Sequence, residues 1–222
     1  MEDRKLVINF IRHGTTKAND EGRFLGWGDE PITDKGRAEL EALKAKYTYP
    51  TVEKVFRSPA TRCRETAAIF FPGVPEEEIE GLWEVGFGEK EGMFASEMAG
   101  TPKMLRWSRM EPDFIMDEKL AESILEARFR VMGAVTNIVK KCRYEGLHEV
   151  AVVFHGAIMC VLMLEALSPD EAAKAFRLSP NGMGIAVEVD MEGWWRRPKF
   201  EMIDYLPVGA ERPAGSPFYE EG

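Results

Sequence analysis

Short runs of apolar residues mark the buried strands of this chain. The first three are Lys5–Ile11, Val52–Arg57 and Glu149–Phe154. Runs of this length, rich in Val, Ile and Phe, are typical of strands buried inside a sheet. Near the end of the chain, two further runs flank a turn at Glu192-Gly193 and predict a hairpin, Gly184–Asp190 with Lys199–Tyr205.

Helical patterns fill the intervals between the strands. Residues Thr33–Tyr47 carry apolar or small residues at helical spacing, and Thr33 is suited to cap the N-terminus. Ser58-Pro59 predicts a second helix start, because serine caps and proline costs nothing in the first turn. That helix is expected to stop at Phe71-Pro72-Gly73. Two more helices are expected, over about Glu118–Tyr144 and directly after Gly156.

Alternation of strands and helices predicts an α/β fold, a three-layer α/β/α sandwich with a mainly parallel sheet. Residues 88–119 interrupt this rhythm, so we expect a small helical cap inserted into a single domain that covers residues 1–206. Residues 207–222 are rich in Pro and Gly with an acidic end, and are expected to be a loosely ordered tail.

Composition restricts the partners of this domain. The formal net charge of −9 argues against a nucleic-acid partner, although a few residues can still form a local positive pocket. The charged N-terminus predicts no signal peptide, and no apolar run has the length of a membrane span. The three cysteines, Cys63, Cys142 and Cys160, lack metal-ligand spacing and fit a reducing compartment. We therefore expect a cytoplasmic protein without a membrane partner.

Two of the three histidines directly follow predicted strands. Arg12-His13 ends the first apolar run and His155 ends the run at 149–154, each histidine being followed by glycine. Because ligands bind beyond the carboxyl ends of strands in open α/β sheets, both histidines are expected on the binding rim. Arg62 would join them from the first turn of the helix after the second strand. His148 precedes its strand and is expected at the surface of the opposite edge.

Two arginines and two imidazoles on one rim repel one another unless an anion lies between them. A phosphoryl group suits them, because guanidinium groups bind its oxygens in pairs and remain charged. Neutral histidine adds a nitrogen that can attack phosphorus and form a covalent intermediate. We interpret Gly14 as the residue that lets the backbone approach the bound group closely. The alternative, two unrelated histidines that happen to end strands, does not explain the arginines.

Four blocks of residues carry a resemblance to a known family. They are Arg12-His13-Gly14-Thr15-Thr16-Lys17-Ala18-Asn19, Ser58-x-x-x-Arg62 with Thr66-Ala67, Leu82-x-Glu84-x-x-x-Gly88-x-x-x-Gly92, and Val153-x-His155-Gly156. The tripeptide Arg12-His13-Gly14 alone is a weak signal, but the set of four blocks, in this order, closely resembles the histidine phosphatase superfamily. More narrowly, it resembles the metal-independent, phosphoglycerate mutase-like branch.

The resemblance implies a role for each residue. His13 would be the nucleophile that carries the phosphoryl group as a phosphohistidine. Arg12, Arg62 and His155 would hold its oxygens and stabilise the transition state. Glu84 would protonate the leaving oxygen and then activate water, a role that requires a raised pKa. Asn19 would be an amide near the phosphate. No metal or other cofactor is expected.

Some positions depart from the family pattern. Thr15 stands where many members have an acidic residue or glutamine, and Ala121-Glu122-Ser123 replaces a common Gly-Glu-Ser. After Glu84 come Val85-Gly86-Phe87, where mutases of this branch usually carry a cation and a tyrosine that bind a phosphoglycerate carboxylate. Mutases also tend to be longer, so both features favour a phosphatase.

Specificity is expected to come from the cap, which combines Lys103, Arg106 and Arg109 with Met and aromatic residues. Leu105 and Trp107 are interpreted as packing residues, although a Met-rich lid would suit a bulky apolar or nucleoside-like leaving group. The Trp194-Trp195 pair is interpreted as edge packing or as a subunit contact in a homo-oligomer.

These features predict a metal-independent phosphatase that hydrolyses a small phosphate monoester through a phosphohistidine. One alternative is a phosphoglycerate mutase. The other is a non-catalytic phosphate-binding protein, which the presence of every expected catalytic residue disfavours. The substrate stays open among a sugar phosphate, a nucleotide, ribazole phosphate and phosphoglycerate.

Overall fold

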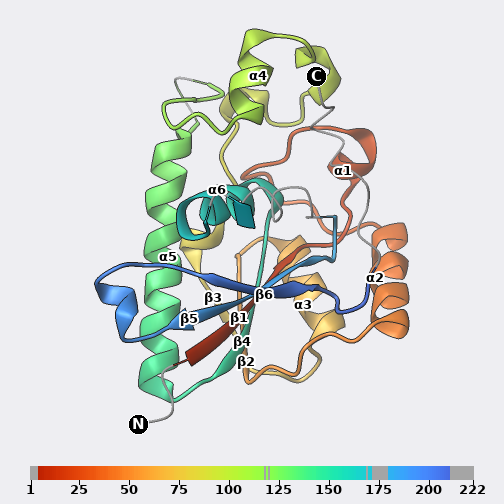
Figure 1. The fold of residues 1–222 in the computed structure, drawn as a ribbon. Coiled ribbons are helices and arrows are strands. Elements are labelled where there is room, and N and C mark those ends of the chain that lie inside the picture. The colour runs from red at the N-terminus through yellow and green to blue at the C-terminus, as the bar shows by residue number, and fades with distance from the viewer. Residues whose placement is uncertain (1–4, 118, 120, 169, 172–179, 211–222) are drawn as a thin grey trace.

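A computed structural model describes residues 5–117, 119, 121–168, 170–171 and 180–210. Its centre is a six-stranded sheet of order β3-β2-β4-β1-β5-β6 (Figure 1). The strands are β1 (Lys5–Arg12), β2 (Lys54–Arg57), β3 (Glu76–Glu78), β4 (Glu149–Phe154), β5 (Gly184–Asp190) and β6 (Glu201–Leu206). The first four pair in parallel, whereas β5 runs antiparallel to both β1 and β6. The predicted α/β fold with a mainly parallel sheet is confirmed, and β3 is an edge strand that the sequence pattern did not indicate.

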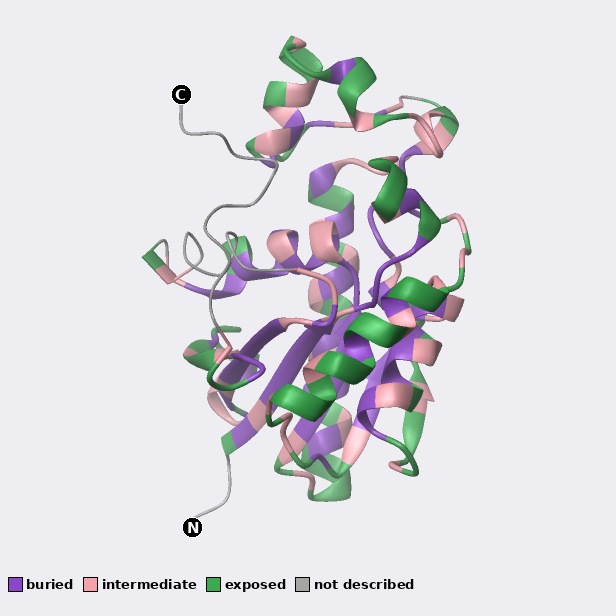
Figure 2. Cartoon of the chain, turned by 90° about the vertical axis from the view of Figure 1, so that its right-hand side faces the viewer, coloured by how far each residue is buried: buried purple, intermediate pink, exposed green. Residues whose placement is uncertain are grey.

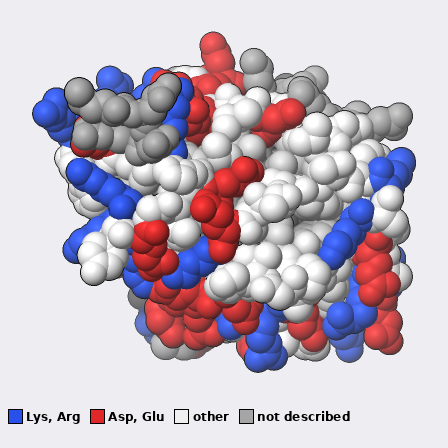
Figure 3. All heavy atoms as spheres, turned by 90° about the horizontal axis from the view of Figure 1, so that it is seen from below, with Lys and Arg blue, Asp and Glu red and all other residues white. Residues whose placement is uncertain are grey.

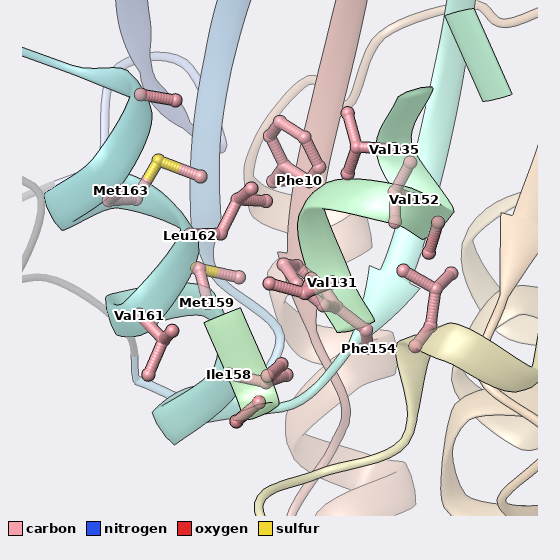
Figure 4. Close-up of a cluster of buried hydrophobic side chains, with 14 of the residues drawn as sticks. Phe10, Val131, Val135, Val152, Phe154, Ile158, Met159, Val161, Leu162 and Met163 are labelled. Carbon is pink, nitrogen blue, oxygen red and sulfur yellow. The ribbon is translucent and has the colours of Figure 1, made fainter. Parts of the chain in front are cut away.

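Helices cover both faces of the sheet. On one face α5 (Ile124–Glu145) and α6 (Gly156–Ala166) pack against Phe10 of β1 and Phe154 of β4 (Figure 4). On the other face α2 (Asp34–Lys46) and α3 (Thr61–Phe70) pack against Ile11 and Val153. Because neighbouring residues of β1 and β4 face opposite covered sides, both strands are apolar almost throughout. Figure 2 shows this band of buried residues through the sheet.

Asn9 interrupts the apolar run of β1 and is nevertheless buried. Its amide nitrogen donates to Glu149 Oε1 and to the carbonyl oxygen of Val150, both at 3.2 Å. The polar side chain therefore ties β1 to β4, the two strands that carry the histidines, and its burial costs little because it is hydrogen-bonded.

The predicted N-terminal cap is confirmed for α2 but not for α3. Thr33 caps α2, its hydroxyl oxygen accepting from the backbone N–H of Gly36 at 3.0 Å, as expected. The prediction that Ser58 caps the next helix is wrong, since α3 starts at Thr61 behind Ala60. Asp29 takes that role from a distant loop, its carboxylate accepting from the Thr61 N–H at 2.7 Å.

The long helix α5 begins at Ile124 and not near Glu118. Ser123 and Glu126 form a capping box there, each side chain accepting from the other residue's backbone N–H. This reciprocal arrangement satisfies two N–H groups that a helix start otherwise leaves without partners, and so fixes the start of α5.

The predicted hairpin is β5 and β6, joined through the short helix η4 (Gly193–Trp195). Trp194 is buried, stacks on Phe200 with ring centroids 5.5 Å apart, and donates from Nε1 to Thr136 Oγ1 at 3.1 Å. Trp194 therefore packs at the sheet edge, as expected. Trp195 is half exposed beside a shallow hollow lined also by Lys140, Arg143 and Tyr144, and a subunit contact there stays a prediction.

The segment between η1 (Glu80–Leu82) and α5 holds η2 (Gly88–Lys90), η3 (Ala95–Met98) and α4 (Pro102–Ser108). It lies at the top of Figure 1, beside α1 (Lys17–Glu21). Backbone hydrogen bonds of 2.8–2.9 Å join residues 92–95 of this segment to residues 22–24. The boundaries 88–119 of a cap, and a single domain over 1–206, stay predictions. Of the predicted tail, Val208 pairs with Thr48, and residues 211–222 lie outside the described residues.

Lys and Arg alternate with Asp and Glu on the face seen in Figure 3, so the described residues there form no continuous basic surface. Within the described ranges, no helix has both the length and the apolar composition that crossing a membrane requires. The three cysteines are free, and burial raises the pKa of the Cys63 thiol to about 12.

Candidate active site

The two strand-end histidines meet. β1 and β4 are adjacent and parallel, and the backbone N–H of His13 donates to the carbonyl oxygen of Phe154 at 2.9 Å. The rings of His13 and His155 consequently lie edge to face with centroids 5.2 Å apart, and both are buried. His148 lies exposed before β4, at the other end of that strand, as expected.

His13 is held with one ring nitrogen available. Nδ1 lies 2.8 Å from the carbonyl oxygen of Gly14, and since a carbonyl only accepts, Nδ1 carries the proton. Burial lowers the pKa of His13 well below its ordinary value, and the charges of Arg62 and Arg12 lower it further. His13 is therefore a neutral imidazole that carries its proton on Nδ1 and its lone pair on Nε2.

His155 is held from both sides. Nδ1 accepts from Nε of Arg62 at 3.1 Å, so Nε2 carries the proton and donates to Ser58 Oγ at 2.8 Å. The indole of Trp83 lies parallel to the imidazole, with centroids 6.3 Å apart. Burial lowers the pKa of His155 well below its ordinary value, and the charge of Arg62 adds to this effect.

Arg62 is fully buried in the first turn of α3. Besides its bond to His155, its guanidinium donates to the carbonyl oxygens of Gly28 at 2.7 Å and Gly26 at 2.9 Å. These neutral acceptors orient the guanidinium without neutralising it, so the positive charge remains available to an anion.

Arg12 lies against the start of α6. A Cβ at Gly156 would stand 3.1 Å from Nε and 3.2 Å from Cζ of Arg12, so the glycine makes room for this guanidinium. Burial lowers the pKa of Arg12, and the nearby carboxylate of Glu84 opposes this shift. In the second His-Gly pair, His155 therefore lies on the rim and Gly156 leaves the space beside it for Arg12.

Glu84 caps α6 from outside the helix. Its Oε1 accepts from the backbone N–H groups of Ile158 at 2.7 Å and Val85 at 2.9 Å, and Oε2 accepts from Ala157 at 3.0 Å. Burial raises the pKa of Glu84, and these backbone donors only partly oppose it. The carboxyl group therefore keeps its proton to a higher pH than an exposed glutamate.

Gly14 has a packing role that the sequence did not indicate. Its φ lies outside the left-handed region, and a Cβ there would stand 2.6 Å from Cδ1 of Leu40 in α2. The missing side chain lets α2 pack closely against the end of β1. That Gly14 lets the backbone approach a bound group stays a prediction.

Asn19 reaches the site through a residue that the sequence did not indicate. Its Oδ1 accepts from Asn181 Nδ2 at 3.0 Å, and the same nitrogen donates to the carbonyl oxygen of His13 at 2.9 Å. Thr16 caps α1 and so supports Asn19. Thr15 donates to Glu39 Oε2 at 2.8 Å, which directs its hydroxyl toward α2.

Ser58 was also missed as a site residue, although a signal was present. It follows β2, which is parallel to and adjacent to β4, so the rule that located His155 also locates Ser58 on the same rim. Asn181 had only a turn signal, Pro-Asn-Gly. Among the described residues, no three His, Cys, Asp or Glu side chains are grouped so that they could hold a metal ion.

The predicted cap residues divide between packing and exposure. Trp107 is buried, as interpreted from the sequence, together with Phe87, Met98 and Phe114. Leu105 is half exposed, so the packing interpretation of that residue is wrong. Arg106 pairs with Glu111 at 2.6 Å and with Asp113 at 2.8 Å, within the cap itself.

The structure is an α/β fold whose mainly parallel sheet ends in two buried histidines, with the buried Arg62 and the partly buried Arg12 beside them. The chain matches the model of the histidine phosphatase superfamily (branch 1) over residues 8–197, and it belongs to that family. Within the superfamily it is phosphoglycerate mutase-like.

Two relatives and one solved structure illustrate this. The chain is 32% identical over 180 residues to 2,3-bisphosphoglycerate-dependent phosphoglycerate mutase 2 of Gloeobacter violaceus, covering 76% of this chain and 80% of the relative. It is 32% identical over 83 residues to adenosylcobalamin/alpha-ribazole phosphatase of Salmonella typhimurium, covering 36% and 41%. A phosphoglycerate mutase structure from Bacillus anthracis matches with a TM-score of 0.75 at 22% identity, covering 91% and 93%, and so shares the fold.

Proposed function

We propose that this chain is a metal-independent phosphatase that hydrolyses a small phosphate monoester through a phosphohistidine on His13. One observation carries the proposal. His13 is buried, neutral and protonated at Nδ1, which leaves Nε2 as a nucleophile next to the buried Arg62 and the partly buried Arg12.

The chemistry would run in two halves. Nε2 of His13 attacks phosphorus, the ester P–O bond breaks, and the leaving oxygen takes the proton of the Glu84 carboxyl. Glu84, now a carboxylate, takes a proton from water while the water oxygen attacks phosphorus and the P–N bond breaks. Phosphate leaves, and His13 and Glu84 return to their starting states. Arg12 and Arg62 would hold the phosphoryl oxygens throughout. His155, whose ring nitrogens pair with Arg62 and Ser58, would contact the phosphoryl group only when its Nε2–H leaves Ser58 Oγ.

The raised pKa of Glu84 supports its role as acid and base, since proton transfer is most efficient when a group titrates near the working pH. Its position supports the role as well. The carboxyl group accepts hydrogen bonds from the backbone N–H groups of Ala157 and Ile158, directly after His155-Gly156, and so lies on the same rim as His13.

A phosphoglycerate mutase is the second candidate, favoured by the similarity to 2,3-bisphosphoglycerate-dependent mutases. The segment after Glu84 argues against it. Val85 and Phe87 are buried in the apolar core, and Gly86 has no side chain, so these positions offer no cation for a substrate carboxylate. The partial similarity to an alpha-ribazole phosphatase supports the hydrolase.

Rapid quench without acid, with an aryl phosphate as substrate, tests the proposal. The wild type should release a burst of aryl alcohol and yield an acid-labile, base-stable phosphoprotein, and His13→Ala should show neither. Glu84→Gln should lower turnover by about 10²- to 10⁴-fold, the usual contribution of general acid–base catalysis. His148→Ala is the matched control, an exposed histidine at the opposite edge, and should behave as wild type.

The alternatives predict different results in the same experiment. A phosphoprotein that discharges only when phosphoglycerate is added would favour the mutase. Absence of both phosphoprotein and aryl alcohol would leave a non-catalytic phosphate-binding protein.

A further inference from the structure

One large aromatic side chain near the site stays accessible. Trp27 is 48% exposed, whereas Phe87, Trp107 and Phe114 are each less than a tenth exposed. The buried rings pack on one another, with the Phe87 and Trp107 centroids 5.2 Å apart. They belong to the packed interior of the segment between η1 and α5 and are unavailable to a ligand.

The backbone on both sides of Trp27 holds Arg62. Gly26 and Gly28, its two neighbours, supply the carbonyl oxygens that accept from the Arg62 guanidinium at 2.9 and 2.7 Å. Trp27 therefore lies between the two residues whose carbonyl oxygens hold Arg62, the arginine that we propose binds the phosphoryl oxygens.

The side chain of Trp27 is fixed to the residue that we assign as the acid. Nε1 of the indole donates to the carbonyl oxygen of Glu84 at 2.9 Å. One face of the ring covers Gly86, where a Cβ would stand 2.7 Å from Cε2 and 2.8 Å from Cζ2. Glycine at 86 thus admits the indole.

Glu91 holds the same loop from the other side. Its Oε1 accepts from the Trp27 N–H at 2.9 Å and from the Phe87 N–H at 3.2 Å, and its Oε2 accepts from the Gly26 N–H at 2.8 Å. The indole is therefore held at its backbone and at its ring nitrogen before any ligand arrives, and little side-chain entropy is lost when a ligand packs on it.

We propose that Trp27 determines substrate specificity, its exposed ring surface packing against an aromatic leaving group of the phosphate ester. This inference rests on the proposed function, since it places the leaving group beside Glu84, which would protonate the leaving oxygen. The substrate class is then a monoester with an aryl or heteroaromatic ring close to the ester oxygen, which an indole favours by offset or edge-to-face contact.

The kinetic test compares an aryl monoester, 1-naphthyl phosphate, with a compact alkyl monoester, glycerol 2-phosphate. Trp27→Ala should lower kcat/KM for the aryl ester about tenfold more than for the alkyl ester, mainly through KM, while Trp27→Phe keeps most of the preference. Trp195→Ala is the matched control, because Trp195 is 47% exposed in the β5–β6 connection, and it should leave the ratio unchanged.

The two Trp27 variants separate contact from support. Both remove the Nε1–H bond to Glu84, so a purely supporting role would depress the two esters equally in both variants. An equal loss, or an unchanged ratio in Trp27→Ala, would overturn the inference while leaving the phosphatase intact.

Equilibrium binding decides the point even without turnover. Calorimetry should show that the wild type binds phenylphosphonate about tenfold more tightly than methylphosphonate, and that Trp27→Ala removes the difference. Equal affinities in the wild type would overturn the inference. A wild type that binds with this preference but hydrolyses neither ester would contradict the proposed function instead.

Discussion

His155 shows how one side chain of the site depends on several others. Its two ring nitrogens are occupied by Arg62 and Ser58, and its ring faces Trp83. Because Arg62 donates to Nδ1, Ser58 must accept from Nε2, and this pair of bonds selects one tautomer. Ser58 is accordingly a positioning residue, which acts on the phosphoryl group only through His155.

Removal of the Ser58 hydroxyl leaves a buried ring N–H without its acceptor. Ser58→Ala should lower the free energy of unfolding by about 1–3 kcal/mol, measured by urea denaturation. It should also lower kcat more than it raises KM, because the ring orientation is lost. Ser58→Thr should restore much of kcat, and the exposed Ser96→Ala should change neither quantity. Equal stability loss with an unchanged kcat would leave Ser58 a packing residue.

The elements place the site because helices approach the strand ends closely. α2 contacts the end of β1 at Gly14, and α6 starts directly behind β4, where Gly156 admits Arg12. Glu84 accepts from the first N–H groups of α6, which binds the candidate acid to the same helix that follows His155. The histidine, the acid and the helix therefore form one connected unit.

The contact of α2 with β1 is testable through Gly14. In Gly14→Ala the new Cβ would lie 2.6 Å from Leu40 Cδ1, so the free energy of unfolding should fall by about 1–3 kcal/mol. Leu40→Ala in the same chain should show a coupling energy that relieves part of this loss in a double-mutant cycle.

Gly133→Ala provides the control for that series. Gly133 lies in α5 with no atom within 4 Å of an added Cβ, so alanine should stabilise the chain by about 0.5–1 kcal/mol. Destabilisation of equal size at both glycines would contradict the packing explanation for Gly14.

For the whole molecule, the buried ionisable groups link stability to pH. The pKa values of His13 and His155 are well below the ordinary value in the folded chain. Below about pH 6.5 the unfolded chain therefore binds protons that the folded chain does not, and stability falls as pH falls. The pKa of Glu84 is raised, so there the folded chain keeps the extra proton, and stability rises as pH falls through that pKa.

Urea unfolding between pH 5 and 8 should show these opposing contributions. The two histidines together should lower the free energy of unfolding by up to about 2.7 kcal/mol per pH unit below pH 6.5. His13→Ala should reduce this slope by about half. Glu84→Gln should steepen the fall in acid, because the opposing proton uptake is lost. A slope that none of the variants changes would contradict the buried, neutral state of these histidines.

Sequence patterns located the rim but not its connections. His13, Arg12 and His155 were predicted because a strand end is a local feature, readable from an apolar run and the residue after it. Arg62 was predicted from a helix start after a strand, although the cap was placed two residues early, at Ser58 where the structure has Ala60. The true cap, Asp29, lies 32 residues away in the chain and left no local signal.

The sequence by itself determined the order of every strand but β3 and of the helices α2, α3, α5 and α6, the faces they bury and the residues at the strand ends, because these depend on neighbours within a few positions. Only the tertiary structure decided that Ser58 supports His155, that Asn181 joins His13 to Asn19, that Leu40 excludes a side chain at position 14, and that Trp27 donates to the carbonyl oxygen of Glu84. Each of these is a contact between segments far apart in the chain, and a local sequence pattern does not show which distant segments come together.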